Sequence, residues 1–278
     1  MRLVWQLLAV AAVALVGSNA VNAVDGSPWL TLTIGLATAV LATFTYVWVV
    51  RRTEHRPPVE VSRRAAPGAL TRGLLIGFAM CAAVIANIWF LGDYHVHGRG
   101  SVTGTLALLG FMAAAAVTEE LIFRGILFRI IEEKIGTWFA MVLTGVLFGA
   151  SHLLNKDATV WGAACIAVEA GFMLAAAYVA TRNLWVGIGV HFAWNFALGG
   201  IFGLEVSGNG TSKGLVDATT SGGTLVSGGT FGPEASVYTL LGGVIITAAF
   251  MWLAGRRGHI LPMRRRDAQV PANATLAK

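Results

Sequence analysis

The sequence has little charge, few cysteines and no alternating strand pattern. Charged residues make up 12% of the 278 residues, whereas hydrophobic residues make up 56%. This composition, with a mean hydropathy of +0.70, excludes an ordinary soluble domain. The two cysteines, Cys81 and Cys165, both lie in apolar segments. We therefore interpret them as small buried side chains and not as a disulfide framework.

Long apolar runs fill most of the chain, and several approach the roughly 20 residues that a helix needs to cross a bilayer. The runs are continuous, and only helices or closed barrels satisfy backbone polar groups in lipid. We therefore predict an all-α, polytopic integral membrane protein with about eight transmembrane helices. The predicted spans are residues 3–23, 29–50, 73–91, 102–123, 138–154, 158–180, 184–204 and 235–254.

Basic residues gather in two places, after the second span and after the last one. Arg51 and Arg52 begin the first block, and 264–266 are three arginines in the second. Because lysine and arginine accumulate in cytoplasmic loops, both blocks and both termini are predicted to be cytoplasmic in a cell membrane. This topology accounts for the net charge of +6. The predicted partner is therefore the lipid bilayer and not a nucleic acid.

These patterns divide the chain into five segments. Residues 205–234 are rich in glycine, serine and threonine, which predicts a flexible external loop. Residues 1–23 also resemble a signal peptide, so cleavage of the first span is an alternative. The predicted segments are an N-terminal transmembrane hairpin (1–50), a cytoplasmic basic linker (51–72), a transmembrane core (73–204), the external loop (205–234), and the last span with a basic cytoplasmic tail (235–278).

The fourth span carries two glutamates and an arginine. A charged group inside a bilayer costs at least about 2.5 kcal/mol and persists mainly where it has a function or a partner. Glu120 and Arg124 are four residues apart, in the order that favours an ion pair. Glu119 points about 100° away from Glu120 on a helix, so the two are predicted to have different roles. Glu119 is free to face another span as a general base or acid, or else to touch interfacial water.

Two later spans each carry a histidine with a partner one helical turn away. Phe148 precedes His152 on the fifth span, and His191 precedes Asn195 on the seventh. The Asn195 amide can orient a carbonyl or stabilise an oxyanion without carrying charge. The alternatives are an interfacial anchor for His152 and a hydrogen-bonded pair between helices for His191 and Asn195.

Other ionisable residues are weaker candidates. Glu169 lies near the middle of the sixth span, where a carboxylate is most costly, and it is a secondary candidate without an assigned role. Glu132 and Glu133 lie in an amphipathic stretch and are predicted to be solvated. His95 and His97 form a His-x-His pair in a predicted external loop, and nothing in the sequence links them to the other site.

Three short motifs, in this order, resemble the CAAX protease and bacteriocin-processing family. They are Glu-Glu-x-x-x-Arg at 119–124, Phe-x-x-x-His at 148–152 and His-x-x-x-Asn at 191–195. Members of this family are intramembrane endopeptidases related to the type II prenyl-protein protease and to lysostaphin-resistance-like proteins. The resemblance covers residues 101–200 and leaves the first two spans and the Gly/Ser/Thr-rich segment outside.

The resemblance also implies a role for each motif residue. Glu119 would activate the attacking water, with assistance from His152. His191 and Asn195 would stabilise the oxyanion of the tetrahedral intermediate. The residues implied to support them are Glu120, Arg124 and Phe148.

Metal dependence is open at this point. Glu119, His152 and His191 come from three helices, and their side chains are of the types that bind Zn²⁺ and leave a position for water. The contiguous His-Glu-x-x-His motif of many metalloproteases is absent from the sequence. We therefore favour water activated by glutamate over water activated by zinc.

The sequence thus predicts an intramembrane endopeptidase that cleaves a membrane-associated protein or peptide in a cavity open toward the cytoplasm. One alternative is a proton-coupled transporter or channel, since intramembrane glutamate and histidine also form proton relays. Another is a non-catalytic membrane immunity or scaffold protein. The sequence does not identify the substrate or the oligomeric state.

Overall fold

A computed structural model describes residues 1–24, 26–210 and 213–263. Within these residues, eight helical stretches are long and apolar enough to cross a membrane, and each overlaps one predicted span. This confirms the prediction of an all-α polytopic membrane protein. The eight stretches are Arg2–Ala23, Pro28–Glu54, Ala66–Phe90, Val102–Ile135, Thr137–Leu154, Val160–Thr181, Leu184–Ile201 and Val237–Arg256.

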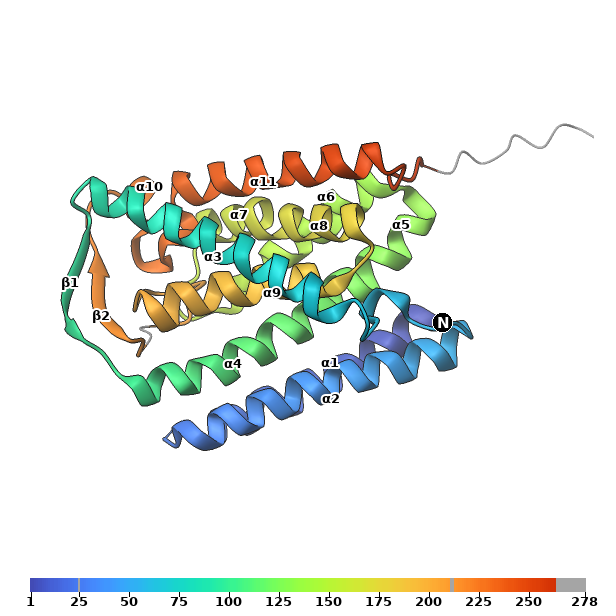
Figure 1. Cartoon of the computed structure of the whole chain (residues 1–278), viewed down its shortest axis with the longest axis horizontal. Coiled ribbons are helices and arrows are strands. Elements are labelled where there is room, and N and C mark those ends of the chain that lie inside the picture. The colour runs from blue at the N-terminus through green and yellow to red at the C-terminus, as the bar shows by residue number, and fades with distance from the viewer. Residues whose placement is uncertain (25, 211–212, 264–278) are drawn as a thin grey trace, which may run out of the picture.

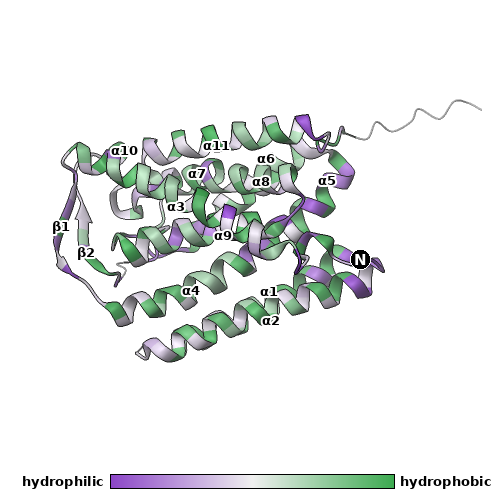
Figure 2. Ribbon diagram, viewed as in Figure 1, coloured by the Kyte–Doolittle hydropathy of each residue, from purple (hydrophilic) through white to green (hydrophobic). Residues whose placement is uncertain are grey.

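The helices lie side by side along one axis, and a two-stranded sheet covers one end of the bundle (Figure 1). Hydrophobic residues cover most of the length of the helices, and hydrophilic residues concentrate at their ends (Figure 2). The elements, in chain order, are α1 (Arg2–Ala23), α2 (Pro28–Glu54), η1 (Val59–Val61), α3 (Ala66–Phe90), β1 (Tyr94–Arg99), α4 (Val102–Glu120), η2 (Leu121–Phe128), α5 (Arg129–Ile135), α6 (Thr137–Ser151), η3 (His152–Leu154), α7 (Val160–Ile166), η4 (Ala167–Phe172), α8 (Met173–Thr181), α9 (Leu184–Asn195), η5 (Phe196–Ile201), β2 (Val216–Thr220), α10 (Thr224–Ser227), η6 (Gly229–Phe231), η7 (Pro233–Ala235) and α11 (Val237–Arg256).

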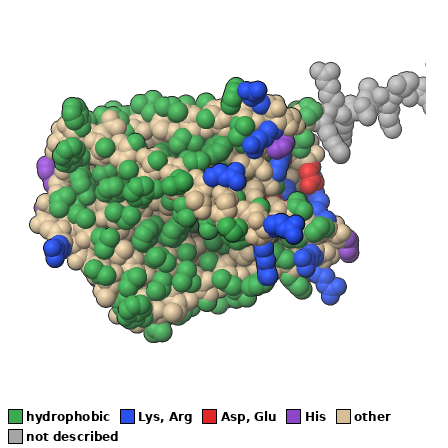
Figure 3. Space-filling view, viewed as in Figure 1, with side chains coloured by type: hydrophobic (Ala, Val, Ile, Leu, Met, Phe, Trp, Pro, Cys, Tyr) green, Lys and Arg blue, Asp and Glu red, His purple; other side chains and the backbone are tan. Residues whose placement is uncertain are grey.

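The two ends of the bundle differ in charge. Lysine and arginine side chains gather at the end where α2 and α11 finish and α3 begins (Figure 3). We call this the basic end, and define it by the exposed Arg51, Arg52, Arg63, Arg64 and Arg256. The opposite end, which carries β1 and β2, is called the strand end. The cytoplasmic location of the basic end remains a prediction, and the arginines of the predicted tail, 264–266, lie outside the described residues.

The segment 205–234 differs from the flexible loop that its composition predicts. Strand β2 pairs with β1 in antiparallel register, and short helical turns follow it. Gly228 and Gly232 have φ angles of 83° and 102°, a conformation that glycine adopts at little cost and that permits the tight turns here. These turns fold the segment onto the bundle, where Phe231 and Glu234 are each 1% exposed.

The histidines His95 and His97 also lie in regular structure and not in a loop. Both belong to β1. Their Nε2 atoms lie 2.9 Å from the Ser221 hydroxyl and 2.8 Å from the Thr219 hydroxyl, respectively. Each imidazole is therefore hydrogen-bonded to a hydroxyl at the strand end, in or directly after β2.

The predicted linker 51–72 is shorter than expected and contains a buried carboxylate. Helix α2 continues to Glu54 and α3 already begins at Ala66. Between them Glu60, 3% exposed, accepts hydrogen bonds from Arg56 at 2.8 Å and from the Tyr46 hydroxyl at 2.6 Å. Burial raises the pKa of Glu60, but these hydrogen bonds outweigh it and leave the pKa below its usual value.

The prediction that Glu132 is solvated was wrong. Glu132 is only 2% exposed. Its carboxylate forms an ion pair with Arg182 and accepts a hydrogen bond from the Thr137 hydroxyl at 2.6 Å. Arg182 follows α8 in the left-handed region, with a φ of 50°, and from there reaches back to α5. The neighbouring Glu133 is 44% exposed, so the two acids of this pair have different environments.

Candidate active site

The predicted ion pair on the fourth span is present and buried. Glu120 Oε1 lies 2.7 Å from Arg124 Nη1, and both side chains are at most 2% exposed. Arg124 also donates hydrogen bonds to the carbonyls of Ala170 and Gly171, at 2.9 and 3.2 Å. The guanidinium therefore joins the end of α4 to η4, on a helix that is distant in sequence.

Three π-helical segments contain or adjoin residues of the candidate site. They are η2, directly after Glu120, η4, which contains Glu169, and η5, directly after Asn195. A π-helical turn shifts the backbone hydrogen bonds from their usual partners, and such turns are frequent at functional sites. In η4, the Ala170 and Gly171 carbonyls accept hydrogen bonds from Arg124. No feature of the sequence predicted these turns.

His191, on α9, lies between the two glutamates. Its Nδ1 is 3.1 Å from Glu120 Oε1, and its Nε2 is 3.8 Å from Glu119 Oε2. The first distance is that of a hydrogen bond, which Nδ1 donates to the carboxylate, and the second is too long for one. The two glutamates point apart, as predicted, yet both face one imidazole because its nitrogens lie on opposite edges of the ring.

Glycines allow α9 to reach this position. A Cβ at Gly73 or Gly77 of α3 would lie 2.3 Å from the carbonyl oxygen of a residue in α9, so the two helices approach backbone to backbone. A Cβ at Gly187 would lie 2.9 Å from Glu120 Oε2. Gly187 therefore leaves the space that the Glu120 carboxylate occupies beside His191.

The Phe148 ring connects the three motifs. It is 1% exposed and lies under the Arg124 guanidinium, with 4.4 Å between the guanidinium carbon and the ring centroid. Its edge-to-face contacts reach both histidines, with centroid distances of 4.9 Å to His152 and 6.0 Å to His191. Phe148 thus fixes the relative positions of the arginine and the two imidazoles.

His152 begins η3, directly after α6. Its Nδ1 lies 2.8 Å from the Phe148 carbonyl, which only accepts hydrogen bonds, so Nδ1 is the donor. In the neutral ring this leaves Nε2 without a proton and able to act as a base. No hydrogen bond joins Nε2 to any residue within the described ranges.

A cavity of about 150 Å³ brings Glu119, His152 and Asn195 to one surface. Glu119 is 33% exposed, and its Oε2 has no hydrogen-bond partner among the described residues. The Asn195 side chain is 8% exposed and forms no hydrogen bond with the described part of the chain. Both residues line the cavity, although the Glu119 Oε2 atom itself is buried. The remaining lining residues are Phe111, Met112, Ala115, Ser151, Asn155, Val206, Ser207 and Asn209.

The cavity extends from Glu119 toward the strand end. Its walls are the part of α4 that precedes Glu119, the end of α6, and residues 206–209. On the opposite side of Glu119, toward the basic end, the chain continues to the buried Arg124. The expectation of a cavity open toward the cytoplasm therefore conflicts with the predicted topology, which makes the basic end cytoplasmic.

A second cavity, of about 10 Å³, joins His152, His191 and Asn195 to two buried carboxyl groups, Glu169 and Glu234. This volume is close to the minimum that one water molecule needs. Glu169 is 1% exposed, and its Oε1 has no hydrogen-bond partner in the described ranges. The secondary candidate thus lines a cavity that the motif residues also line.

Glu234 is a site residue that the sequence did not indicate. It accepts a hydrogen bond from Trp194 Nε1 at 3.0 Å and another from the backbone N–H of Ser207. Burial raises its pKa, and the two hydrogen bonds counteract part of this rise. Its contacts fix Trp194, which precedes Asn195, and Ser207, which lines the larger cavity. The sequence around Glu234 is rich in glycine, serine and threonine, and it gave no indication that this carboxyl group would contact the candidate site.

The described residues do not form a ready metal site. No three histidine, cysteine, aspartate or glutamate side chains among them are grouped so that they could hold an ion. The Nδ1 hydrogen bonds of His191 and His152 leave both Nε2 atoms free, as in metal-binding histidines, so they do not argue against zinc. It is the lack of grouping among Glu119, His152 and His191 that does not fit the compact ligand arrangement that zinc requires.

Comparisons with known proteins show that the region containing the three motifs is similar to membrane endopeptidases. Residues 101–197 match the family model described as "Type II CAAX prenyl endopeptidase Rce1-like". The "Putative membrane peptidase YdiL" of Bacillus subtilis (strain 168) is 30% identical over 115 residues. This similarity covers 37% of the chain and 45% of the relative, so the chain spans less than half of the relative's length. No solved structure gives a significant match.

Proposed function

We propose that this chain is an intramembrane endopeptidase with Glu119 as its base, a function that the match of residues 101–197 to the Rce1-like family model supports. The observation that supports this most directly is the position of the Glu119 carboxylate. It lines a cavity, has an oxygen without a hydrogen-bond partner among the described residues, and faces His191 Nε2 across 3.8 Å. No atom fits between two groups at this distance, so the attacking water is proposed to lie beside them, where the Glu119 carboxylate lines the cavity.

In the proposed reaction, Glu119 takes a proton from water as the water oxygen forms a bond to the carbonyl carbon of the peptide. The carbonyl oxygen becomes an oxyanion, which accepts hydrogen bonds from the Asn195 amide and from His191 Nε2–H. The carbon–nitrogen bond then breaks, and the amine nitrogen takes up the proton that Glu119 removed. His152 Nε2, which has no proton in the neutral ring, assists this transfer.

The charges around His191 favour such a donor. Glu119 and Glu120 contribute two negative charges and Arg124 one positive charge, so a protonated His191 makes the group neutral. Glu120 accepts the hydrogen bond from Nδ1, and in the protonated ring Nε2–H is the donor that faces Glu119. The Glu120–Arg124 pair thus has a positioning role, since it orients His191 and does not touch the reacting atoms.

The direction of the cavity suggests how a substrate arrives. A peptide reaches Glu119 from the strand end, along the face of α4 that carries Phe111 and Ala115. With the basic end in the cytoplasm, this is the external side of the membrane. The proposed substrate is therefore a membrane-associated protein or peptide with its scissile bond close to the external surface.

N-terminal peptide profiling of host membranes tests this function. Wild type is compared with Glu119→Gln at equal expression, and Glu133→Gln, which changes an exposed glutamate outside the cavity, is the matched control. New N-termini are expected with wild type and Glu133→Gln but not with Glu119→Gln, and they should map to external segments. Identical profiles in all three strains would contradict proteolysis and favour proton transport, which flux measurements in liposomes would then examine.

A further inference from the structure

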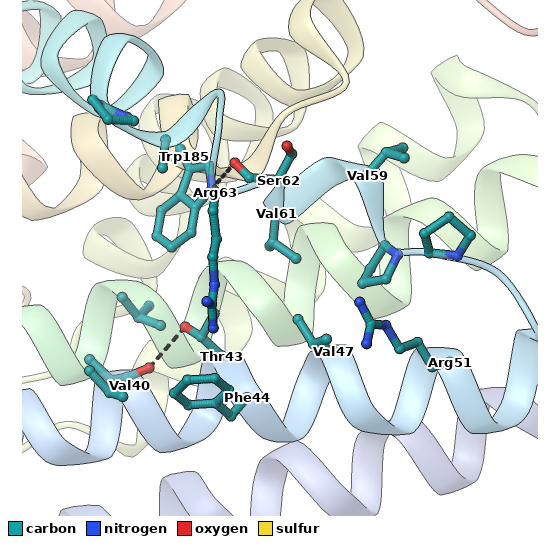
Figure 4. Close-up of a pocket in the computed structure, with 16 residues that line it drawn as sticks. Val40, Thr43, Phe44, Val47, Arg51, Val59, Val61, Ser62, Arg63 and Trp185 are labelled. Carbon is teal, nitrogen blue, oxygen red and sulfur yellow. Dashed lines mark hydrogen bonds between the residues drawn. The ribbon is translucent and has the colours of Figure 1, made fainter.

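A groove of about 900 Å³ lies at the basic end, away from the candidate active site (Figure 4). One wall is the final part of α2, and the other is formed by η1, the start of α3 and Trp185 of α9. Its volume falls within the roughly 300–1,000 Å³ of small-molecule pockets. The lining is mostly apolar and includes Val40, Phe44, Val47 and Val61.

Among the residues that the structure describes, the charged side chains that line this groove are Arg51 and Arg63 alone. Figure 4 shows Arg63 reaching across the groove to α2, where its guanidinium carbon lies 5.5 Å from the centroid of the Phe44 ring. Within the described residues neither arginine has an ion-pair partner. The nearby carboxylates Glu54 and Glu60 are already paired with Arg56 and Arg129, so the charge of the groove is uncompensated.

The polarity of the groove changes along the membrane normal. Arg51 lies in the last turn of α2, and Val40 lies eleven residues earlier. At a rise of 1.5 Å per residue, the apolar floor extends about 16 Å from the arginine toward the bilayer centre. Val40 and Phe44 are 54% and 53% exposed, so the floor is open to lipid along its length. Arg51 lies at the mouth and the Arg63 guanidinium lies beside Phe44, so the cationic part occupies the outer half of the groove and the apolar floor continues to Val40. This order matches that of headgroup and acyl chain in a phospholipid.

We propose that this groove is a binding site for an anionic phospholipid, with its phosphate between Arg51 and Arg63 and one acyl chain along Val40 and Phe44. Basic pockets between transmembrane helices favour anionic headgroups because the local charge attracts them and the arginine fork donates to phosphate oxygens. A zwitterionic lipid gains less from the two arginines, since its own ammonium group offsets the phosphate charge. The site is independent of the proposed proteolysis.

Native mass spectrometry of the full-length protein in detergent tests the site. The probes are dioleoyl-phosphatidylglycerol, dioleoyl-phosphatidylcholine and inorganic phosphate. The test variant is Arg51→Gln/Arg63→Gln, and the matched control is Arg52→Gln/Arg64→Gln, which removes two adjacent exposed arginines that do not line the groove. Size-exclusion profiles and thermal unfolding without added lipid establish that both variants are folded.

Phosphatidylglycerol is expected to bind wild type and the control with similar dissociation constants. At roughly fivefold per arginine, the test variant should bind it about thirtyfold more weakly. Phosphatidylcholine should bind weakly to all three proteins. Equal losses in the two double variants would overturn the proposal, because they would show general surface attraction. Competition by inorganic phosphate at a similar concentration would also overturn it, because it would identify a phosphate site without a lipid.

Discussion

The buried residues Glu120 and Arg124 are expected to contribute to the free energy of unfolding as a coupled pair, so that losing either one removes most of the contribution of both. Removing one partner of a buried ion pair typically costs about 3–5 kcal/mol, because the other charge stays buried without compensation. Arg124 is 2% exposed and Glu120 is 0% exposed, so neither reaches solvent when its partner is lost. Arg124→Met also removes the donor for the Ala170 and Gly171 carbonyls.

The size of the effect follows from these contacts. Glu120→Gln should cost about 3 kcal/mol, since the amide keeps an acceptor for His191 but not the charge. Arg124→Met should cost about 5 kcal/mol, since it leaves one buried carboxylate and two carbonyls without their partner. The double variant should cost little more than Arg124→Met alone. The expected coupling between the two sites is therefore about 3 kcal/mol.

Equilibrium unfolding in mixed micelles, with increasing SDS and circular dichroism as the signal, measures these differences. Arg256→Met changes an exposed arginine beside Trp252 and is expected to alter stability by less than about 0.5 kcal/mol. If the costs of Glu120→Gln and Arg124→Met simply add in the double variant, the two residues are not a coupled pair. The positioning role proposed for them would then be refuted.

Three further predictions concern the site and its surroundings. Gly187→Ala places a methyl group 2.9 Å from Glu120 Oε2, so peptide turnover should fall at least about tenfold. The control is Gly242→Ala, whose Cβ is closest to the flexible Met80 side chain and which should leave turnover unchanged. Burial raises the pKa of Glu205 to about 7, so the stability contributed by its neutral form is present below pH 4.5 and is lost as the pH rises through 7. The melting temperature of wild type should therefore fall between pH 5.5 and pH 8 by more than that of Glu205→Gln. Turnover by the purified protein should resist EDTA, because Glu119, His152 and His191 do not form a compact ligand set, and a loss restored by added zinc would contradict this.

The sequence predicted the features that depend on one helix. Apolar runs located the eight spans, and the four-residue spacing of Glu120 and Arg124 predicted their contact, because helical periodicity places such residues on one face. The same spacing placed Phe148 beside His152. The motif residues do meet, around two cavities that share His152 and Asn195, although their catalytic roles remain proposals.

Features that depend on packing between distant segments were not predictable in this way. The burial of Glu132 depends on Arg182, and the burial of Glu60 depends on Arg56 and Tyr46. A charged stretch has the same local pattern whether it is solvated or paired. The role of Glu234 was not predicted because it too depends on packing between distant segments. The glycine turns of segment 205–234 bring Glu234 back to Trp194. The direction of the cavity likewise depends on which loops cover it.

The most direct test of the account is peptide hydrolysis by the purified protein in liposomes. The substrate is a peptide identified by the membrane profiling, and wild type is compared with Glu119→Gln and Glu133→Gln at equal unfolding stability. The account predicts that Glu119→Gln lowers turnover by at least about a thousandfold, whereas Glu133→Gln retains wild-type turnover. Turnover by Glu119→Gln at a rate close to that of wild type would contradict the proposed role of Glu119 as the base.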